Sequence, residues 1–317
     1  MADVVDNEPN RKGPLAWLAY AGFRAVLGFF ALLPLPVSAW IAGEISALGI
    51  RLFAWKRMKE ARAFMAQRYG PERAREIVRS NLRHYGILIA EIAHRETLKR
   101  EVATRYTFRG DENFLRARAK GGVLAVQGHI SNWEVKAIGH VAKYGGLTVP
   151  VKRVHNYYVN RWIEQHRIFT GVTALADRGT KEKLIEDLLA GKPITFLADQ
   201  NTMDNDAVWV PLLGRMAATR VGPTALAIRG KAVVITFMAR RIKPGYFELS
   251  YGPEIELPDE SFGTHKERLY EGTRRVNLAL DGLIDSVPEQ WLWLHRRWKR
   301  LPPPDVEPWR LGRKESV

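Results

Sequence analysis

Short apolar runs of strand-like residues alternate with helical segments through the middle of this 317-residue chain. The strand-like runs are 122–127, 147–151, 194–197, 232–238 and 246–251, and segments with helical spacing are 71–93, 133–144, 157–169, 181–190 and 222–229. Strands that alternate with helices typically build a parallel sheet covered by helices. The sequence therefore predicts an α/β fold with a mixed, mostly parallel sheet.

The first fifty residues have a different character. Residues 15–33 contain a single charged side chain, Arg24, and residues 37–48 contain only Glu44. A helix needs about 20 apolar residues to span a bilayer, and a charge near its middle is costly. Because prolines interrupt the stretch at 34 and 36, we expect a membrane anchor or a hairpin in the membrane plane. A secretory signal peptide and a pair of ordinary buried helices are the alternatives.

The positive charge of the chain follows directly after this apolar region. The net charge is +15 with a pI of about 10.0, and residues 51–100 hold thirteen Lys or Arg against five Asp or Glu. Such a surface attracts polyanions. Trp17, Tyr20, Trp40 and Trp55 bracket the apolar stretch, as aromatic residues do at a membrane interface. The combination favours an anionic membrane surface with the main body on the cytoplasmic side.

These patterns divide the chain into an N-terminal membrane-associated region (1–50), an α/β domain (51–305) and a C-terminal tail (306–317). The chain contains no cysteine, which excludes disulfide frameworks, thiolate zinc sites and cysteine nucleophiles. Signature motifs of phosphate-binding loops, serine hydrolases, zinc proteases and dinucleotide-binding folds are also missing from the sequence. Any catalytic chemistry has to come from a different arrangement.

The segment GGVLAVQGHISNWE (121–134) places His129 between a buried strand and a helix. Within one regular helix, residues five apart diverge by about 140°. With His129 in the preceding loop and Glu134 in the first helical turn, the two side chains can meet. A carboxylate on one imidazole nitrogen leaves the other free to take a proton from an attacking hydroxyl. We predict that His129 is a general base oriented by Glu134; the alternative is that Ser131 and Glu134 only form a helix-capping box.

GHISNWE resembles the H-x4-[DE] motif of the lysophospholipid acyltransferase superfamily. In detail it is similar to the branch of lipid A biosynthesis (lauroyl/myristoyl) acyltransferases, which typically read G-H-x-G-N-W-E; here Ser131 replaces the second glycine. Further blocks resemble this branch in the same order along the chain: VPVKR (149–153), ADRG (176–179), LADQN (197–201), VPLLGRMAAT (210–219) and PEQWLWLHRRWK (288–299). The resemblance covers nearly the whole chain.

The resemblance implies a glycerol-phosphate-acyltransferase-like fold at the cytoplasmic face of a bacterial inner membrane. The implied reaction moves a fatty acyl chain from an acyl carrier protein thioester to a hydroxyl of a phosphorylated glycolipid, the lipid A precursor, without an acyl-enzyme, a metal or an organic cofactor. One alternative is an enzyme that uses acyl-CoA as donor and a lysophospholipid or phosphoinositide mannoside as acceptor. A basic nucleic-acid-binding protein is the non-enzymatic alternative, since tryptophans alternate with arginines in 291–300.

We assign five residues to substrate binding: Asn132, Arg153, Arg178, Asp199 and Gln200. Asn132 is a candidate donor to the oxyanion of the transition state. Arg153 matches the region where the family places an arginine for the acceptor phosphate, and the guanidinium groups of Arg153 and Arg178 suit bidentate phosphate binding. Asp199 and Gln200 end a predicted strand at the same sheet edge as His129, where they can support the loop of the site.

Overall fold

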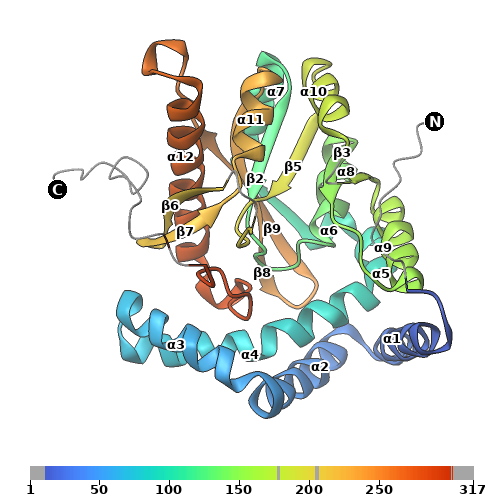
Figure 1. Ribbon diagram of the computed structural model, residues 1–317. Helices are drawn as coiled ribbons and strands as arrows, with labels where there is room; N and C mark the ends of the chain where they lie inside the picture. Colours follow the sequence, from blue (N-terminus) through green and yellow to red (C-terminus); the bar gives the residue numbers. More distant parts are fainter. Residues whose placement is uncertain (1–10, 177–178, 204–206, 301, 303–317) are drawn as a thin grey trace.

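The computed structural model describes residues 11–176, 179–203, 207–300 and 302. At its centre lies a seven-stranded sheet with the strand order β1-β9-β8-β2-β5-β3-β4 (Figure 1). Its strands are β1 (Tyr106–Arg109), β2 (Val123–Gln127), β3 (Leu147–Val151), β4 (Val172–Ala176), β5 (Pro193–Leu197), β8 (Val233–Lys243) and β9 (Tyr246–Glu254). A separate antiparallel pair consists of β6 (Val208–Leu212) and β7 (Arg215–Thr219).

The sheet is mixed and mostly parallel, which confirms the predicted fold class. Strands β8, β2, β5, β3 and β4 pair in parallel, whereas β9 runs antiparallel to β8 and β1 pairs in parallel with β9. All five residues of β2 are buried, as expected of a central parallel strand covered on both faces. The carboxyl ends of β2 and β5 lie side by side, because Gln127 is in register with Leu197.

Helices cover both faces of the sheet. One face packs against α7 (Asp111–Lys120), α8 (Lys136–Tyr144) and α9 (Tyr157–Thr170), and the other against α10 (Lys181–Leu189), α11 (Gly222–Arg229) and α12 (His265–Ser286). Side chains of β2 alternate between the two resulting cores: Leu124 and Val126 belong to one, Val123 and Ala125 to the other. Short helical turns occur at α5 (Arg95–Arg100), α6 (Val102–Arg105), η2 (Glu260–Phe262) and η3 (Pro288–Gln290).

Several elements were not predicted from the sequence. β1 and β4 form the two edges of the sheet, and edge strands are short and only partly buried, so their apolar pattern is weak. α12 is 22 residues long and begins at a capping box in which Thr264 and Glu267 bond each other's backbone. Its apolar positions follow the helical period, but many charged residues between them dilute the signal.

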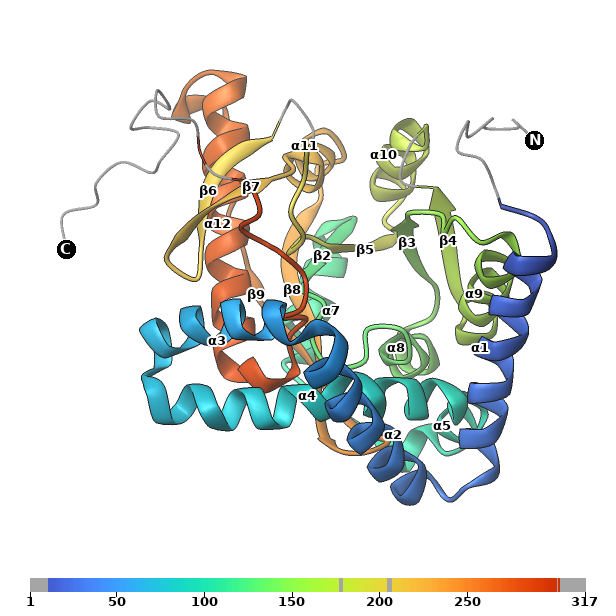
Figure 2. The same ribbon diagram turned by 60° about the horizontal axis from the view of Figure 1, so that its bottom comes forward.

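Before the sheet the chain forms four helices: α1 (Pro14–Leu32), α2 (Leu35–Gly49), α3 (Trp55–Tyr69) and α4 (Pro71–Ala93). A π-helical turn, η1 (Ile50–Ala54), joins α2 to α3 without a break. Figures 1 and 2 show α1, α2 and α3 along one side of the molecule, with α4 between α2, α3 and the sheet, and α1 beside α9. α1 and the run 35–69 are long and apolar enough to cross a membrane. In α1 only Leu27 and Phe30 are buried. These helices suggest membrane association, and their exposure argues against ordinary buried helices.

α2 and α4 pack unusually closely. A Cβ added at Gly86 of α4 would lie 1.9 Å from the carbonyl oxygen of Ala42 in α2, so this crossing requires glycine. Nearby, Nε of Arg83 donates to Oε1 of Glu44 at 2.5 Å, which pairs the one acidic residue of the second apolar stretch. α2 is therefore attached firmly to α4, while its opposite face remains exposed.

Candidate active site

The loop that follows β2 carries His129. The loop is fixed to residues 288–299, which we call the C-terminal strap. Ser131 donates its backbone N–H to the carbonyl of Gln290 at 2.8 Å, and Leu292 donates its backbone N–H to the carbonyl of His129 at 3.1 Å. Two chain segments 160 positions apart thus hold the backbone on both sides of the histidine, so its side chain projects from a rigid support.

The carboxylate that contacts His129 belongs to Asp199, in the loop after β5. Its Oδ1 lies 2.6 Å from Nδ1 of His129, and its Oδ2 accepts the backbone N–H of the same residue at 2.7 Å. Oδ2 also accepts the indole N–H of Trp291 at 2.6 Å. Asp199 is 2% exposed, so it can orient the histidine but is too buried to contact a substrate. This revises the substrate-binding role predicted for it.

The charge of Asp199 is stabilised by its hydrogen-bond partners. Burial by itself raises the pKa of a carboxyl group, but the charge of His129 and the hydrogen bonds from His129 and Trp291 outweigh burial and lower the pKa of Asp199 to about 2. Asp199 is therefore ionised at neutral pH. An ionised carboxylate at Nδ1 stabilises an imidazolium formed when Nε2 accepts a proton.

Gln200 contacts the opposite nitrogen of the ring. Its Nε2 lies 3.2 Å from Nε2 of His129. The carboxylate of Asp199 accepts at Nδ1 and the amide nitrogen of Gln200 lies at Nε2, an arrangement that suits an imidazole with its proton on Nδ1 and a lone pair on Nε2, the form a general base needs. The Gln200 side chain is exposed, so a substrate hydroxyl can take the place of its amide. The predicted grouping of His129, Asp199 and Gln200 at one sheet edge agrees with the structure.

Glu134 does not contact His129, contrary to our prediction. α8 begins only at Lys136, so Glu134 lies in a turn before the helix and not in its first turn. Its Oε1 accepts a hydrogen bond from Nη2 of Arg167 at 3.3 Å. The helix has no side-chain cap, so the alternative capping box with Ser131 is also not formed. Glu134 nevertheless lines the same cavity as His129.

Asn132 is buried and its amide is already used. Its Nδ2 donates to the carbonyl of Leu88 at 3.1 Å and to Oε2 of Glu91 at 3.0 Å, both on α4. Its Oδ1 accepts the backbone N–H of Val135 at 3.4 Å. The predicted role as oxyanion donor is therefore wrong for this conformation, because neither amide hydrogen points to the cavity. Asn132 instead attaches the loop that carries His129, which we call the catalytic loop of the candidate site, to α4.

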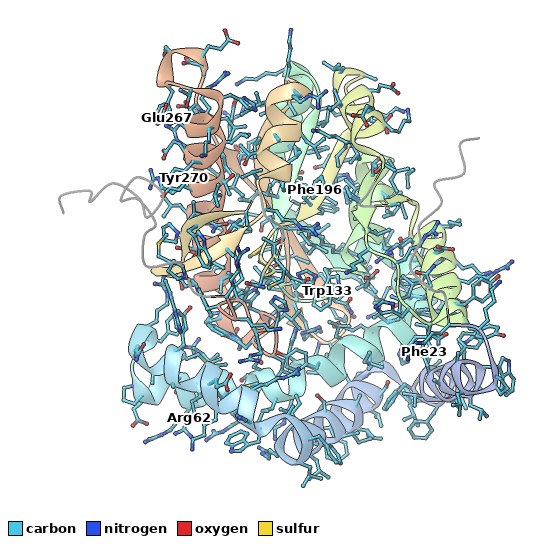
Figure 3. All side chains as sticks on the ribbon, in the orientation of Figure 1. Phe23, Arg62, Trp133, Phe196, Glu267 and Tyr270 are labelled. Carbon is cyan, nitrogen blue, oxygen red and sulfur yellow. The ribbon has the colours of Figure 1, made fainter. Side chains whose placement is uncertain are left out.

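His129 opens into a cavity of about 940 Å³. The volume is near the upper end for small-molecule sites. Trp133 and Phe196, both labelled in Figure 3, form part of its wall together with aliphatic residues such as Leu147, Val172 and Leu226. Among the described residues that line it, Glu134 is the single carboxylate, against five Lys or Arg besides Lys136, whose pKa is lowered by burial: Lys152, Arg167, Lys181, Arg220 and Arg229. The cavity thus combines apolar walls with a positive lining.

Of the two arginines predicted to bind phosphate, the structure describes only Arg153. Arg153 is exposed, next to Lys152 of the cavity lining, and does not itself line the cavity. Arg178 lies outside the described residues. Lys152, Lys181 and Arg229 line the cavity without a carboxylate partner among the residues the structure describes, so they are better placed to bind an anionic group there. No motif in the sequence distinguished these three from other basic residues.

Residues 6–300 match the family described as bacterial lipid A biosynthesis acyltransferase. The chain belongs to this family. It is similar to the lipid A biosynthesis palmitoleoyltransferase of Escherichia coli (strain K12), with 25% identity over 299 residues covering 91% of this chain and 93% of that protein. It is also similar to the lipid A biosynthesis lauroyltransferase of the same organism, with 26% identity over 298 residues covering 91% and 94%. The protein is therefore an acyltransferase of lipid A biosynthesis, and the nucleic-acid-binding alternative is not needed.

In this acyltransferase, Ser131 has a backbone conformation that favours glycine. Its φ is +55°, in the left-handed region, and its buried hydroxyl has no hydrogen-bond partner. Left-handed backbone costs a non-glycine residue about 1–2 kcal/mol, of which glycine's flexibility in the unfolded chain offsets about 0.4–1 kcal/mol. Ser131→Gly should therefore raise the free energy of unfolding by up to ~1 kcal/mol in denaturant titrations. Ser131→Ala, which keeps the strain, is the control; a Gly variant less stable than the Ala variant would contradict this account.

Proposed function

We propose that this acyltransferase moves a fatty acyl chain from the thioester of acyl carrier protein to a hydroxyl of a phosphorylated glycolipid, the lipid A precursor. The observation that carries the mechanism is the hydrogen-bonded series from Trp291 through Asp199 to His129, with Nε2 facing the cavity. Support for the substrates comes from the family and from the cavity, whose apolar walls suit an acyl chain and whose cations suit a phosphate.

In the proposed reaction, the acceptor hydroxyl replaces the Gln200 amide at Nε2 of His129. The imidazole takes the hydroxyl proton while the oxygen attacks the thioester carbonyl, forming a tetrahedral oxyanion. The C–S bond then breaks, and the proton passes from the imidazolium to the leaving thiolate. The ester and a free thiol are the products, and no acyl-enzyme is formed. Asp199 stays ionised throughout and stabilises the imidazolium.

Glu134 keeps a proposed role at the substrate side of the site. Its carboxylate lines the cavity and is held by Arg167, so it can accept a hydrogen bond from a sugar hydroxyl of the acceptor. Lys152, Lys181 and Arg229 would bind the acceptor phosphate, with Arg153 nearby at the surface. An acidic carrier protein would be attracted by the net charge of +15. We place the enzyme at the cytoplasmic face of the inner membrane, where this donor would be available.

The test is to incubate the purified full-length enzyme with a phosphorylated glycolipid or a lysophospholipid as acceptor and with acyl carrier protein thioesters or acyl-CoA as donor, and to identify products by mass spectrometry. Acylated glycolipid should form with the carrier-protein donor. His129→Ala should lower the rate roughly 10²–10⁴-fold, the usual contribution of a general base, without changing the thermal unfolding temperature markedly. Full activity of His129→Ala would refute the mechanism. Transfer from acyl-CoA to a lysophospholipid, with none to the phosphorylated glycolipid, would refute the proposed substrates.

A further inference from the structure

We propose that α1 and α2 lie flat in the interface of an anionic membrane and that neither crosses it. The inference rests on the membrane association proposed above and adds the orientation of the helices. Length and composition alone allow either arrangement, because α1 and the run 35–69 are both apolar and long enough to span. The contacts of α1 with the rest of the protein decide between them.

Both ends of α1 are attached to the folded body. Just before the helix, Arg11 donates its backbone N–H to the carbonyl of His155 at 2.9 Å. Just after it, Nε2 of His94 contacts the carbonyl of Leu33 at 2.9 Å. A 19-residue helix is about 28 Å long, close to the ~30 Å hydrocarbon thickness of a bilayer. A spanning α1 would have its ends on opposite sides of the membrane, so one of these attachments would have to break.

α1 is also attached along its length. Asn156, at the start of α9, donates its Nδ2 hydrogen to the carbonyl of Ala16 at 2.8 Å. The ring of Phe23 meets Trp162 of α9 edge-on, with centroids 4.9 Å apart. Leu27 and Phe30 complete this side and are 6% and 5% exposed. Since α9 also carries charged side chains, α1 cannot enter the hydrocarbon lengthwise without undocking or taking these charges with it.

The opposite side of the same helices is apolar and uncovered. Its exposed large side chains are Leu15, Trp17, Leu18, Val26, Phe29 and Leu32 on α1, Val37, Trp40, Ile45 and Leu48 on α2, and Leu52 and Phe53 on η1. We call these residues the apolar platform. Leu32 and Phe53 are 86% and 89% exposed, which is costly in water. Figures 1 and 2 show that α1, α2 and η1 lie on one side of the molecule, so the platform can contact a single surface.

Charge beside the platform identifies the occupant as an anionic lipid surface. α3 continues from η1 and carries exposed Lys56, Arg57, Lys59 and Arg62, and Figure 3 shows Arg62 on the side of α3 away from the sheet. Arg24 is also exposed on α1. Cations next to an apolar face rich in tryptophan are typical of helices that lie at the level of anionic headgroups. A second copy of this chain would bring the same positive charges together.

The natural absence of cysteine makes a depth measurement direct, because single cysteines can be spin-labelled in the native background. We would label Leu18→Cys, Ala25→Cys and Leu32→Cys on α1 in the full-length protein, bound to vesicles of phosphatidylglycerol and phosphatidylethanolamine. An in-plane helix predicts similar immersion depths for all three labels. A spanning helix predicts a gradient of ~20 Å over these 14 positions. Leu115→Cys is the control, since Leu115 is an exposed leucine on α7, which lies at the end of the molecule away from the platform.

The expected result is shallow, uniform immersion of the three labels, a Leu115 label in water, and binding that weakens when neutral phosphatidylcholine replaces the anionic lipid. A depth gradient along α1 would overturn the in-plane orientation but leave membrane association intact. Failure to bind either type of vesicle would overturn both. Labels that become shielded without lipid, at rising protein concentration, would show that a second copy covers the platform and would overturn the inference.

Discussion

Replacing Asp199 with asparagine should lower the turnover number of acyl transfer roughly 10³–10⁴-fold, as loss of the orienting carboxylate does in comparable catalytic groups. The reason is the control of the histidine tautomer. Asp199 is the carboxylate at Nδ1 of His129, and it holds the proton on that nitrogen so that Nε2 is free. An asparagine amide can turn its NH2 toward Nδ1 and stabilise the wrong tautomer. The measurement is kcat and its pH dependence with acyl carrier protein thioester as donor.

Glu134→Gln is the matched comparison, because it makes the same chemical change in the carboxylate that the H-x4-E spacing favours. Glu134 contacts Arg167 and the cavity, so its neutral variant should raise KM for the acceptor more than it lowers kcat. Thermal unfolding of both variants controls for the loss of the hydrogen bond from Trp291 to Asp199. A large loss of kcat in Glu134→Gln with nearly normal kcat in Asp199→Asn would assign the orienting role to Glu134.

Glu91→Ala should destabilise the protein by about 3–5 kcal/mol, the cost of leaving a buried charge without its partner. Oε1 and Oε2 of Glu91 accept hydrogen bonds from Nε and Nη2 of Arg241 at 2.6 and 2.7 Å, and both side chains are buried. Glu91 also accepts from Asn132 at 3.0 Å and from the backbone of Gly245 at 3.1 Å. Removing it leaves the guanidinium of Arg241 uncompensated and frees the catalytic loop.

The measurement is the free energy of unfolding by denaturant titration. Lys120→Ala is the control, because Lys120 pairs with Glu254 at the surface, where ion pairs contribute only about 0–1 kcal/mol. Activity should fall further in Glu91→Ala than the folded fraction explains, since Asn132 loses one of its two acceptors on α4. A loss of stability no greater than that of Lys120→Ala would show that the buried network contributes little.

The fold could be predicted largely from the sequence where burial is complete. β2 is apolar throughout because both of its faces are covered, and α11 and α4 have the bounds that helix formers and breakers indicate. The edge strand β4 and the charged helix α12 escaped prediction, because each keeps one side in water. The break between α1 and α2 was predictable from its prolines, whereas their docking against α9 and α4 depends on contacts distant in sequence.

The sequence brought three of the candidate site residues to one place but did not predict how they pair. The sequence placed His129, Asp199 and Gln200 at one sheet edge because parallel strands end together. It assigned the histidine's carboxylate to Glu134, which is close in sequence, whereas the partner lies 70 residues away. Which carboxylate contacts His129 depends on where α8 begins and on Arg167, which forms a hydrogen bond with Glu134. Trp291 lies in the segment 288–299, which resembles the family, but nothing in the sequence indicated that its indole N–H donates to Asp199.

α4 contacts both α2, which carries part of the apolar platform, and the loop that carries His129. In the proposed membrane orientation, this arrangement would set the height of the reaction above the lipid. One side of α4 packs on α2 at Gly86, and other residues of α4 bind the loop through Asn132 and the strap through Asn81, whose Nδ2 donates to the carbonyl of Trp291 at 2.8 Å. Two stacked helices are on the order of 20 Å thick, more than the headgroup layer of one leaflet. In the proposed membrane orientation, an acceptor anchored in the bilayer would therefore have to be drawn partly out of its leaflet to reach His129. The enzyme would work on lipids lifted to a fixed level, and lipids held tightly by their neighbours would be acylated slowly.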